Sequence, residues 1–394
     1  MELSISTNEF KERQQKVISQ LAERKIECMI IFSTTDINYL TNFNFRPSER
    51  PIALIIDPKQ KTHLFVPHME KEHAEEYAVV DFVFEYPEYP GEVHPMKLLK
   101  DYLLNLDFQN KNVGVDSLGY SSPKGYRGEK LNDLLDSNNY VSIQGLVEKM
   151  RMIKSKKEIE LIKESSKWGN LAHSLLVRYS KPGANETEIT GRATLEATLS
   201  MIDTIGSIAK FHGDPVNAFY RGQIGKHSYF PHSQPQNFTL KQGDQVVSQA
   251  EANIDGYRSE LERTMFIKDV SKEQEKYFNL IVQAQDIAFH SIVPGKPLSY
   301  VEENVRAFYK ENNVEHLIRH HTGHNIGLIN HEAPFFDLGE DTIIQPGMVA
   351  TIEPALYVEN LGGFRHSDTI LVTENGAERL TYYPRDLESL IIGN

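Results

Sequence analysis

The chain contains very little cysteine, since Cys28 is the only one among 394 residues. A single cysteine excludes a disulfide bond within the chain, and this fits a reducing compartment. Cys28 lies in the apolar run Cys28-Met29-Ile30-Ile31-Phe32, which favours a buried structural thiol over a reactive nucleophile. We therefore expect a cytoplasmic location.

Long apolar stretches and a surplus of positive charge are absent as well. No run of about 18 apolar residues occurs, so the sequence predicts no membrane-spanning helix, and the charged N-terminal segment lacks an apolar signal region. The 42 Lys and Arg are outnumbered by 55 Asp and Glu, which gives a formal net charge of −13. This balance argues against nucleic acid or an anionic membrane as the main partner. A small-molecule substrate is the expected partner.

The length of the chain predicts two domains. In the first part, helical and strand patterns alternate, which indicates a small α/β domain over residues 1–147. Two of its strands are separated only by Pro58-Lys59-Gln60, a plausible hairpin turn. The expected elements are a helix at 8–24, strands at 29–33, 51–57 and 61–66, a helix at 96–105 and a strand at 112–116.

The second predicted domain covers residues 148–394 and mixes helices with strands, so the fold class is α/β (α+β). Ser155 is expected to cap a long helix, with Glu158 at the capping-box spacing. Two helix–break–helix units, at 158–198 and 272–311, indicate an internal duplication. Strands are expected at 245–254, 257–267, 348–357 and 369–373.

Several short motifs are spread along nearly the whole chain. They are Asp36–Phe43, Glu49–Leu54, Met150–Ser155, Gln249–Glu251, Leu261–Thr264, His321–Leu328, His331-Glu332, Pro346–Met348 and Glu353-Pro354. Together they resemble the pita-bread family of aminopeptidase P, prolidase, methionine aminopeptidase and creatinase. The resemblance implies a small N-terminal domain followed by a C-terminal pita-bread domain that carries the active site.

The resemblance also bears on metal binding. The metallopeptidases of this family use two Asp, one His and two Glu as ligands, and the matching positions here hold Gln249, Glu260, His324, Glu353 and Ser367. An amide and a hydroxyl at two of these positions make the pattern similar to the metal-free creatinase branch, which implies no cofactor. A single metal on Glu260, His324 and Glu353 remains an alternative, since three protein ligands can form an open site.

The resemblance implies that positions 249 and 260 face one pocket, and strand periodicity adds further acidic residues to it. Residues 245–254 and 257–267 form a hairpin pattern around Asp255-Gly256, and side chains alternate between faces along a strand. Glu251 therefore shares a face with Gln249, and Glu262 shares one with Glu260. Buried carboxylates raise each other's pKa, so this pocket needs metals, a cationic substrate or shared protons.

The resemblance to creatinase implies roles for most of the remaining candidates, although Glu251 and Glu260 are acids that creatinase lacks. Glu262 and Glu353 would hold a cationic group of the substrate, unless Glu262 pairs with Arg263 or Arg365. His232 would carry protons. His324 and His331 would orient or polarise the substrate. Further substrate-binding positions are Arg50, donated by the second subunit of a homodimer, together with Glu251, Glu260, Gln249, Phe335 and Ser367.

We interpret the chain as a metal-independent, creatinase-like hydrolase of a non-peptide C–N bond. Phe335 and Ser367 replace an Arg and a His of creatinase, so the substrate would be a cationic or zwitterionic amidine, guanidino or amide compound other than creatine. One alternative is an Xaa-Pro metallopeptidase with altered ligands, as His331-Glu332-Ala333-Pro334 suggests. The other alternative is a binding protein without catalysis.

Overall fold

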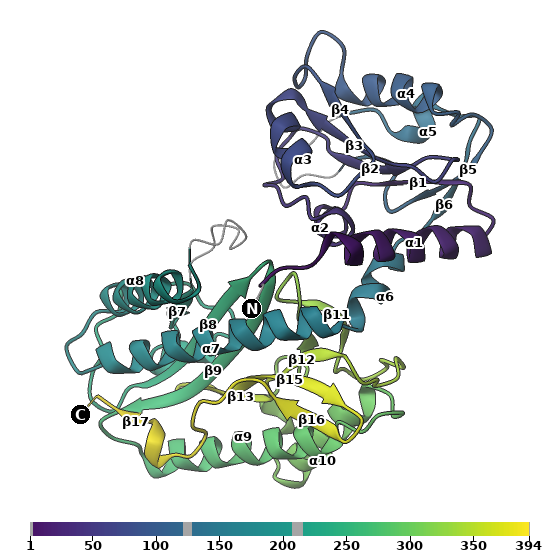
Figure 1. Cartoon of the computed structure of the whole chain (residues 1–394). Helices are drawn as coiled ribbons and strands as arrows, with labels where there is room; N and C mark the ends of the chain where they lie inside the picture. Colours follow the sequence, from purple (N-terminus) through teal and green to yellow (C-terminus); the bar gives the residue numbers. More distant parts are fainter. Residues whose placement is uncertain (1–2, 121–127, 207–215, 394) are drawn as a thin grey trace. The chain divides into compact units, whose positions relative to one another are not determined.

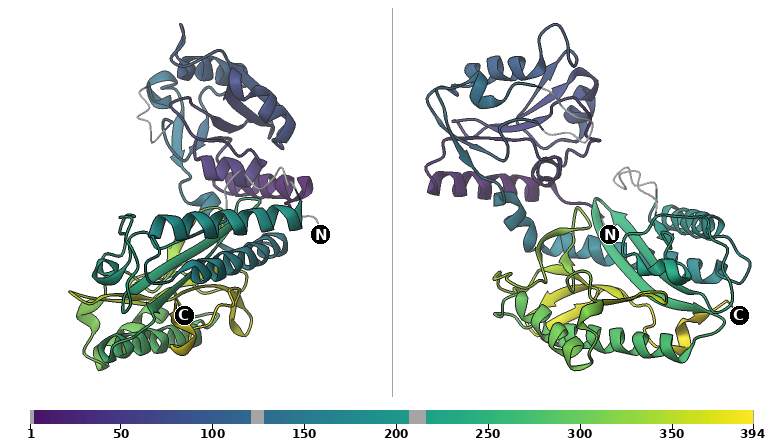
Figure 2. Two further views of the ribbon diagram at one scale, coloured as in Figure 1. Left: turned by 90° about the vertical axis from the view of Figure 1, so that its left-hand side faces the viewer. Right: turned by 180° about the vertical axis from the view of Figure 1, so that it is seen from behind.

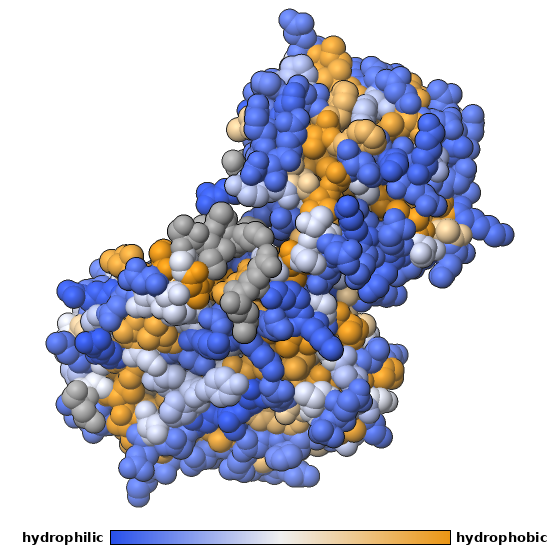
Figure 3. Space-filling model, in the orientation of Figure 1, coloured by the Kyte–Doolittle hydropathy of each residue, from blue (hydrophilic) through white to orange (hydrophobic). Residues whose placement is uncertain are grey.

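A computed structural model describes residues 3–120, 128–206 and 216–393. The chain forms two compact units, one of Ile5–Arg151 and the other of the residues from Met152 onward together with Leu3 and Ser4. Both combine helices and strands, which confirms the predicted fold class (Figure 1). The face seen in Figure 3 is mainly hydrophilic, with apolar side chains scattered over it. Among the described residues, no helix is long and apolar enough to cross a membrane.

The N-terminal unit is built on a six-stranded sheet of order β4-β3-β2-β1-β5-β6. The pairs β1–β2 and β2–β3 are antiparallel, so the predicted hairpin is confirmed, and the other three pairs are parallel. The strands are β1 Cys28–Ile31, β2 Ala53–Ile56, β3 Thr62–Pro67, β4 Phe82–Tyr86, β5 Asn112–Val115 and β6 Asn139–Ser142. The helices are α1 Thr7–Glu23, α2 Thr34–Thr41, α3 Lys71–Tyr77, α4 Pro95–Asn105, α5 Leu131–Leu134 and α6 Leu146–Met152, with a 3₁₀ turn, η1, at His68–Glu70.

Apolar side chains of this sheet and of the helices packed on it form the core of the N-terminal unit. Cys28 belongs to that core and is fully buried. Removal from water raises the pKa of its thiol to about 12. The prediction of a buried structural thiol is thus confirmed.

The C-terminal unit contains a nine-stranded sheet whose main path is β11-β10-β12-β15-β9-β8-β7. Strand β16 extends it beside β15 and β17 beside β9, while β13 and β14 form a separate pair. The strands are β7 Asn217–Phe219, β8 Gln245–Ile254, β9 Tyr257–Ile267, β10 His324–Asn325, β11 Glu332–Phe335, β12 Val349–Ile352, β13 Ala355–Val358, β14 Gly362–Arg365, β15 Ser367–Thr373, β16 Gly376–Arg379 and β17 Ile391–Ile392.

Two pairs of helices cover the two halves of this sheet. Helices α7 and α8 pack against β7–β9, whereas α9, beside α10, packs against β12–β14 and β16 (Figures 1 and 2). These pairs correspond to the two predicted helix–break–helix units. The helices are α7 Lys156–Tyr179, α8 Glu186–Ile205, α9 Lys272–Ser291 and α10 Ser299–Glu311, with 3₁₀ turns η2 Gly225–Tyr229, η3 Glu315–Leu317 and η4 Glu388–Leu390.

Local sequence explains where α7 begins and where one predicted strand breaks. Ser155 and Glu158 form the predicted capping box, in which each side chain accepts a hydrogen bond from the other residue's backbone N–H. The strand expected at 348–357 is divided into β12 and β13 by Glu353-Pro354. Proline lacks the N–H that a continuous strand would need. The break leaves Glu353 between two strands.

Candidate functional site

Two long strands, β8 and β9, supply most of the acidic side chains of the candidate site. They pair as the predicted hairpin, with Asp255 and Gly256 at the turn, both with positive φ. Gln249 lies directly opposite Glu262, and Glu251 lies directly opposite Glu260. Residues directly opposite in an antiparallel pair project from the same face of the sheet. Three carboxylates and one amide therefore share one face.

A second group of site residues comes from β10 and the end of β12. A Cβ atom on Gly323 would lie 2.1 Å from the carbonyl oxygen of Thr351, so only glycine permits this approach of the two chain segments. The backbone N–H of Glu353 donates to the carbonyl oxygen of Thr322 over 2.7 Å. These contacts hold His324, which follows Gly323, beside Glu353.

Glu260, His324 and Glu353 form a compact buried cluster. Each offers one possible metal-ligand atom, and these atoms all lie within 4.8 Å of one another. They are the three residues that the sequence named for a single-metal site. Carboxylate and imidazole groups are suitable ligands for zinc and related divalent ions.

The hydrogen bonds of His324 leave one ring nitrogen available to a cation. Its Nδ1 lies 3.0 Å from the carbonyl oxygen of Asn325, and only a protonated Nδ1 can donate there. Nε2 is then unprotonated, buried and without a hydrogen-bond partner, 3.3 Å from Oε1 of Glu353. Burial, followed by the nearby His331, lowers the pKa of His324 to about 3. Metal-binding histidines commonly donate their other N–H to a carbonyl in this way.

The two carboxyls of the cluster are strongly perturbed. Burial, reinforced by the charge of Glu262, raises the pKa of Glu260 to about 8, although the Ser367 hydroxyl donates to its Oε1 over 2.9 Å. Burial and then the charges of Glu260 and Glu262 raise the pKa of Glu353 well above its usual value. A divalent cation beside the unprotonated Nε2 of His324 would neutralise both carboxylates. The donor set therefore fits one metal ion.

The remaining two ligand positions implied by the resemblance offer weaker donors. The buried Oε1 of Gln249 has no hydrogen-bond partner, and the hydroxyl of Ser367 is engaged with Glu260. Ser367 lies opposite Glu262 in the β9–β15 pair, so it belongs to the same pocket. A neutral amide and a neutral hydroxyl add no charge to balance a second divalent ion.

Glu262 is already paired within the chain. Nη2 of Arg365 donates to its Oε1 over 2.6 Å, and Nε donates to its Oε2. Arg365 also donates to the Tyr357 hydroxyl over 3.1 Å. Arg263, next to Glu262 in sequence, instead contacts Asp368 over 2.9 Å, with both side chains completely buried. The expected grip of Glu262 on a substrate cation is therefore replaced by a bidentate ion pair with Arg365.

The other predicted histidines are more exposed. His331 stacks on His324, with ring centroids 3.9 Å apart. Partial burial lowers the pKa of His331, and the nearby charge of His232 adds to the effect. His232 follows Pro231, and desolvation followed by the charges of Arg221 and Arg365 lowers its pKa. Both rings are thus held toward the neutral form.

Three further predicted residues each have their own partners. Oε1 and Oε2 of Glu251 accept hydrogen bonds from Asn217 over 3.3 Å and from Asn330 over 2.8 Å. The Phe335 ring packs against His321, with centroids 5.3 Å apart. Arg50 belongs to the N-terminal unit and pairs with Glu49 and Glu88 there, at 2.5 and 2.8 Å. Its donation across a dimer interface stays a prediction.

Arg221 and Tyr357 were not anticipated from the sequence. Neither residue belongs to a motif named above, and the sequence alone does not connect them to the carboxylates. A backbone signal marks Arg221, whose φ of +53° is uncommon for a residue other than Gly, Asn or Asp. Only a three-dimensional structure carries that signal.

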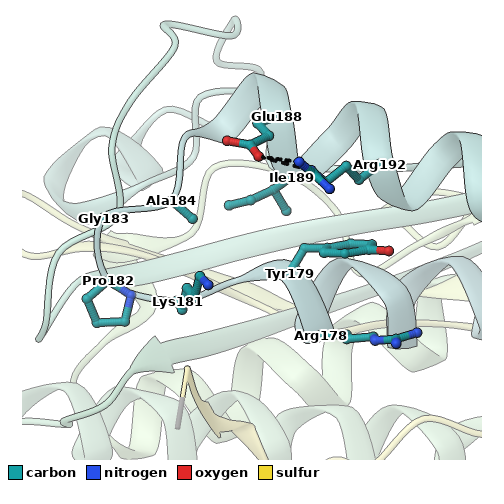
Figure 4. Close-up of a pocket in the computed structure, with 9 residues that line it drawn as sticks. All are labelled: Arg178, Tyr179, Lys181, Pro182, Gly183, Ala184, Glu188, Ile189 and Arg192. Atoms are coloured by element: carbon teal, nitrogen blue, oxygen red, sulfur yellow. Dashed lines mark hydrogen bonds and ion pairs between the residues drawn. The ribbon is translucent and has the colours of Figure 1, made fainter.

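A separate pocket of about 480 Å³ lies where α7 connects to α8 (Figure 4). Its cations are partly balanced, because Arg192 pairs with Glu188 and Arg178 with Glu196. None of the residues expected in the site lines this pocket, so it is distinct from the carboxylate cluster. It is lined by Arg178, Tyr179, Lys181, Pro182, Gly183, Ala184, Glu188, Ile189 and Arg192.

Two family models match the chain. The model of metallopeptidase family M24 covers residues 160–374, and the model of the creatinase/prolidase N-terminal domain covers residues 13–153. A putative dipeptidase of Bacillus subtilis is 28% identical over 379 residues, which is 95% of this chain and 99% of that protein. An uncharacterized peptidase of Staphylococcus aureus is 27% identical over 370 residues, which is 94% of this chain and 99% of that protein.

Solved structures give the same picture of the fold. The Xaa-Pro dipeptidase from Bacillus anthracis superposes with a TM-score of 0.78 at 25% identity, covering 96% of this chain and 99% of that one. The prolidase from Pyrococcus horikoshii gives a TM-score of 0.79 at 24% identity, with 95% and 99% covered.

These comparisons overturn the predicted reaction. The prediction of a metal-independent hydrolase of a non-peptide C–N bond is wrong, because the relatives are named as peptidases and dipeptidases and the matching catalytic model is that of metallopeptidases. The prediction treated Gln249 and Ser367 as evidence that no metal binds. Three strong donors nevertheless remain together in one cluster, which is enough for one ion.

Proposed function

Because the chain belongs to metallopeptidase family M24, and is therefore a hydrolase of the pita-bread fold, we propose that it is a dipeptidase of the Xaa-Pro type that uses one divalent metal ion. This membership confirms the resemblance drawn from the sequence motifs. The cluster of Glu260, His324 and Glu353 carries the proposal, since its free Nε2 and two protonatable carboxyls match a single cation. The dipeptidase names of its relatives support the substrate class.

Each residue of the cluster has a defined task in this proposal. Glu260, His324 and Glu353 would hold a divalent ion, which would supply Lewis acidity for hydrolysis. The carbonyl oxygen of Asn325 fixes the tautomer of His324 and thereby the direction of its Nε2 lone pair. Ser367 orients the Glu260 carboxylate through its hydroxyl.

Proton transfer would fall to the more exposed imidazoles. His232 and His331 have lowered pKa values, so both are neutral near pH 7 and able to accept a proton. A proton taken from water by one of them can be returned to the leaving nitrogen, as general acid–base catalysis requires. Arg365 pairs with Glu262, so the negative charge of Glu262 is balanced within the chain and needs no metal ion.

Metal stoichiometry combined with hydrolysis tests this function. Chelator-treated protein is offered Mn²⁺, Co²⁺ or Zn²⁺, and bound metal and release of proline from Xaa-Pro dipeptides are measured. We expect about one equivalent per chain, from the single three-donor set, and metal-dependent cleavage. His324→Ala should lose both, while His316→Ala, which alters an exposed histidine in η3, should keep both. Less than about 0.1 equivalent bound by the parent protein, with no cleavage, would overturn the proposal.

We also propose a cytoplasmic homodimer. The single cysteine supports the location. The resemblance to creatinase supports the dimer, in which Arg50 would reach the site of the second subunit. Light scattering gives the mass of the assembly, and a mass of one chain at micromolar concentration would contradict the dimer.

A further inference from the structure

Arg221 occupies a constrained position directly after Tyr220, close to the end of β7. Its φ of +53° is a left-handed conformation that an arginine rarely adopts. Buried neighbours fix this conformation on both sides. The Tyr220 hydroxyl lies 2.6 Å from that of Ser180, and the backbone N–H of Gly222 donates to the buried Glu186 over 2.5 Å. The direction in which the Arg221 side chain leaves the backbone is therefore set by the fold.

The guanidinium group of Arg221 is only partly satisfied. Nη2 donates to the carbonyl oxygen of Pro231 over 3.2 Å, while the buried Nε has no hydrogen-bond partner in the described part of the chain. Among the described residues no carboxylate pairs with Arg221, in contrast to Arg365, whose charge Glu262 balances. A buried N–H donor without an acceptor is costly unless a ligand or water provides one.

Hydrogen bonds tie Arg221 to the candidate site. Nη2 of Arg221 donates to the carbonyl oxygen of Pro231 over 3.2 Å, and Nη1 of Arg365, the partner of Glu262, donates to the same oxygen over 3.4 Å. Gln223 also donates to this oxygen, over 3.3 Å, so the segment before His232 is tied to the Arg221 turn. The positive charge of Arg221 contributes in addition to the lowered pKa values of His232 and His331.

We propose that Arg221 binds the free C-terminal carboxylate of the substrate through Nε and a neighbouring N–H. A guanidinium offers two parallel N–H groups that match the two oxygens of a carboxylate. The inference rests on the proposed dipeptidase function and narrows its substrate class. The carboxylate of a dipeptide belongs to the residue directly after the cleaved bond, so this contact would select dipeptides over longer peptides and over C-terminal amides.

Substrates with and without the carboxylate charge test the proposal. Hydrolysis of Ala-Pro and of Ala-Pro amide by the metal-loaded protein is compared with hydrolysis by Arg221→Gln and Arg221→Lys. We expect the parent protein to favour the free acid by roughly 10- to 100-fold in kcat/KM, the range of a charge-assisted hydrogen-bonded contact. Arg221→Gln should lose this preference mainly through KM. Arg221→Lys keeps the positive charge but lacks the paired N–H groups, so it should retain part of the preference for the free acid.

A binding measurement and a matched variant accompany the kinetics. The rise in unfolding temperature caused by proline, relative to prolinamide, should disappear in Arg221→Gln. Arg192→Gln removes an exposed arginine of the separate pocket and should preserve both preferences. If Arg221→Gln is too unstable to assay, Arg221→Lys decides the question, and an undiminished preference for the acid in that variant overturns the assignment.

The outcomes separate this inference from the function on which it rests. A parent protein that hydrolyses neither compound overturns the dipeptidase proposal and the inference with it. Cleavage by the parent protein with an unchanged preference in Arg221→Gln overturns the inference alone. Loss of the preference in Arg50→Gln, with retention in Arg221→Gln, would instead assign the carboxylate to Arg50.

Discussion

His324 presents an unprotonated Nε2 to Oε1 of Glu353 at 3.3 Å. Two electron-rich atoms at this distance repel each other unless a proton or a cation lies between them. Both groups are buried, and burial raises the pKa of Glu353 well above its usual value, so its carboxyl holds a proton in the metal-free protein. A bound cation would take the place of that proton beside Nε2.

Metal binding should therefore stabilise the fold through His324. We expect saturating Mn²⁺ or Zn²⁺ to raise the unfolding free energy by about 3–4 kcal/mol at 100 to 1,000 times the dissociation constant. His324→Ala should abolish this gain. Thermal unfolding with and without the ion measures it, and His316→Ala serves as the control. An equal gain in His324→Ala would place the metal elsewhere.

The metal-free protein should lose stability as pH rises. The pKa of Glu260 is raised from 4.5 to about 8 in the folded state, so its proton stabilises the fold fully below pH 4.5, and this contribution is lost as pH rises to about 8. Glu260→Gln removes the titrating group. The unfolding free energy of this variant should therefore change less between pH 5 and 8 than that of the parent protein, by on the order of a few kcal/mol. Urea unfolding at several pH values measures it. A steeper decline in Glu260→Gln than in the parent protein would contradict the assignment.

The ion pair of Glu262 and Arg365 should behave as a unit. Arg365→Met leaves a buried carboxylate next to Glu260 and Glu353, and should cost about 3–5 kcal/mol of unfolding free energy. Removal of the acid as well, in Glu262→Leu/Arg365→Met, should recover most of this loss, because no unpaired charge remains. Denaturant unfolding of the two single variants and the double variant gives the coupling energy. Purely additive losses would show that the two residues do not act as a pair.

Much of this site could be predicted from local patterns. The β8–β9 hairpin follows from alternating side chains and Asp255-Gly256, and the same alternation places Gln249 with Glu251 and Glu260 with Glu262 on common faces. The resemblance added His324 and Glu353 to this group. These predictions succeed because they depend on strand periodicity and short motifs.

Other features depend on contacts between distant segments. The Glu262–Arg365 pair joins residues 103 positions apart and was only one of two pairings left open by the sequence. The positive φ of Arg221 is imposed by buried neighbours, and the sequence Tyr220-Arg221-Gly222 does not predict it. The predicted reaction failed because it gives the two missing ligands more weight than the three donors that remain. The sequence names these three donors for a single metal, and the fold brings their ligand atoms within 4.8 Å of one another.

Restoring acidic residues at the two altered ligand positions should create a second metal site. Gln249 and Ser367 lie opposite Glu262 in neighbouring strand pairs, so both side chains project toward the cluster. We expect Gln249→Asp/Ser367→Glu to bind about two equivalents of Mn²⁺ instead of one. Without metal, two added carboxylates beside Glu260 and Glu353 should lower the unfolding free energy by several kcal/mol, since like charges repel in a buried site.

Elemental analysis after dialysis gives the stoichiometry of this variant, and thermal unfolding gives its metal-free stability. Gln249→Asn/Ser367→Thr keeps both positions neutral and is the matched control, with one equivalent expected. If the acidic variant binds one equivalent and unfolds like the control, positions 249 and 367 do not face the metal cluster. Two equivalents, together with reduced metal-free stability, would show that these two residues limit the natural site to one ion.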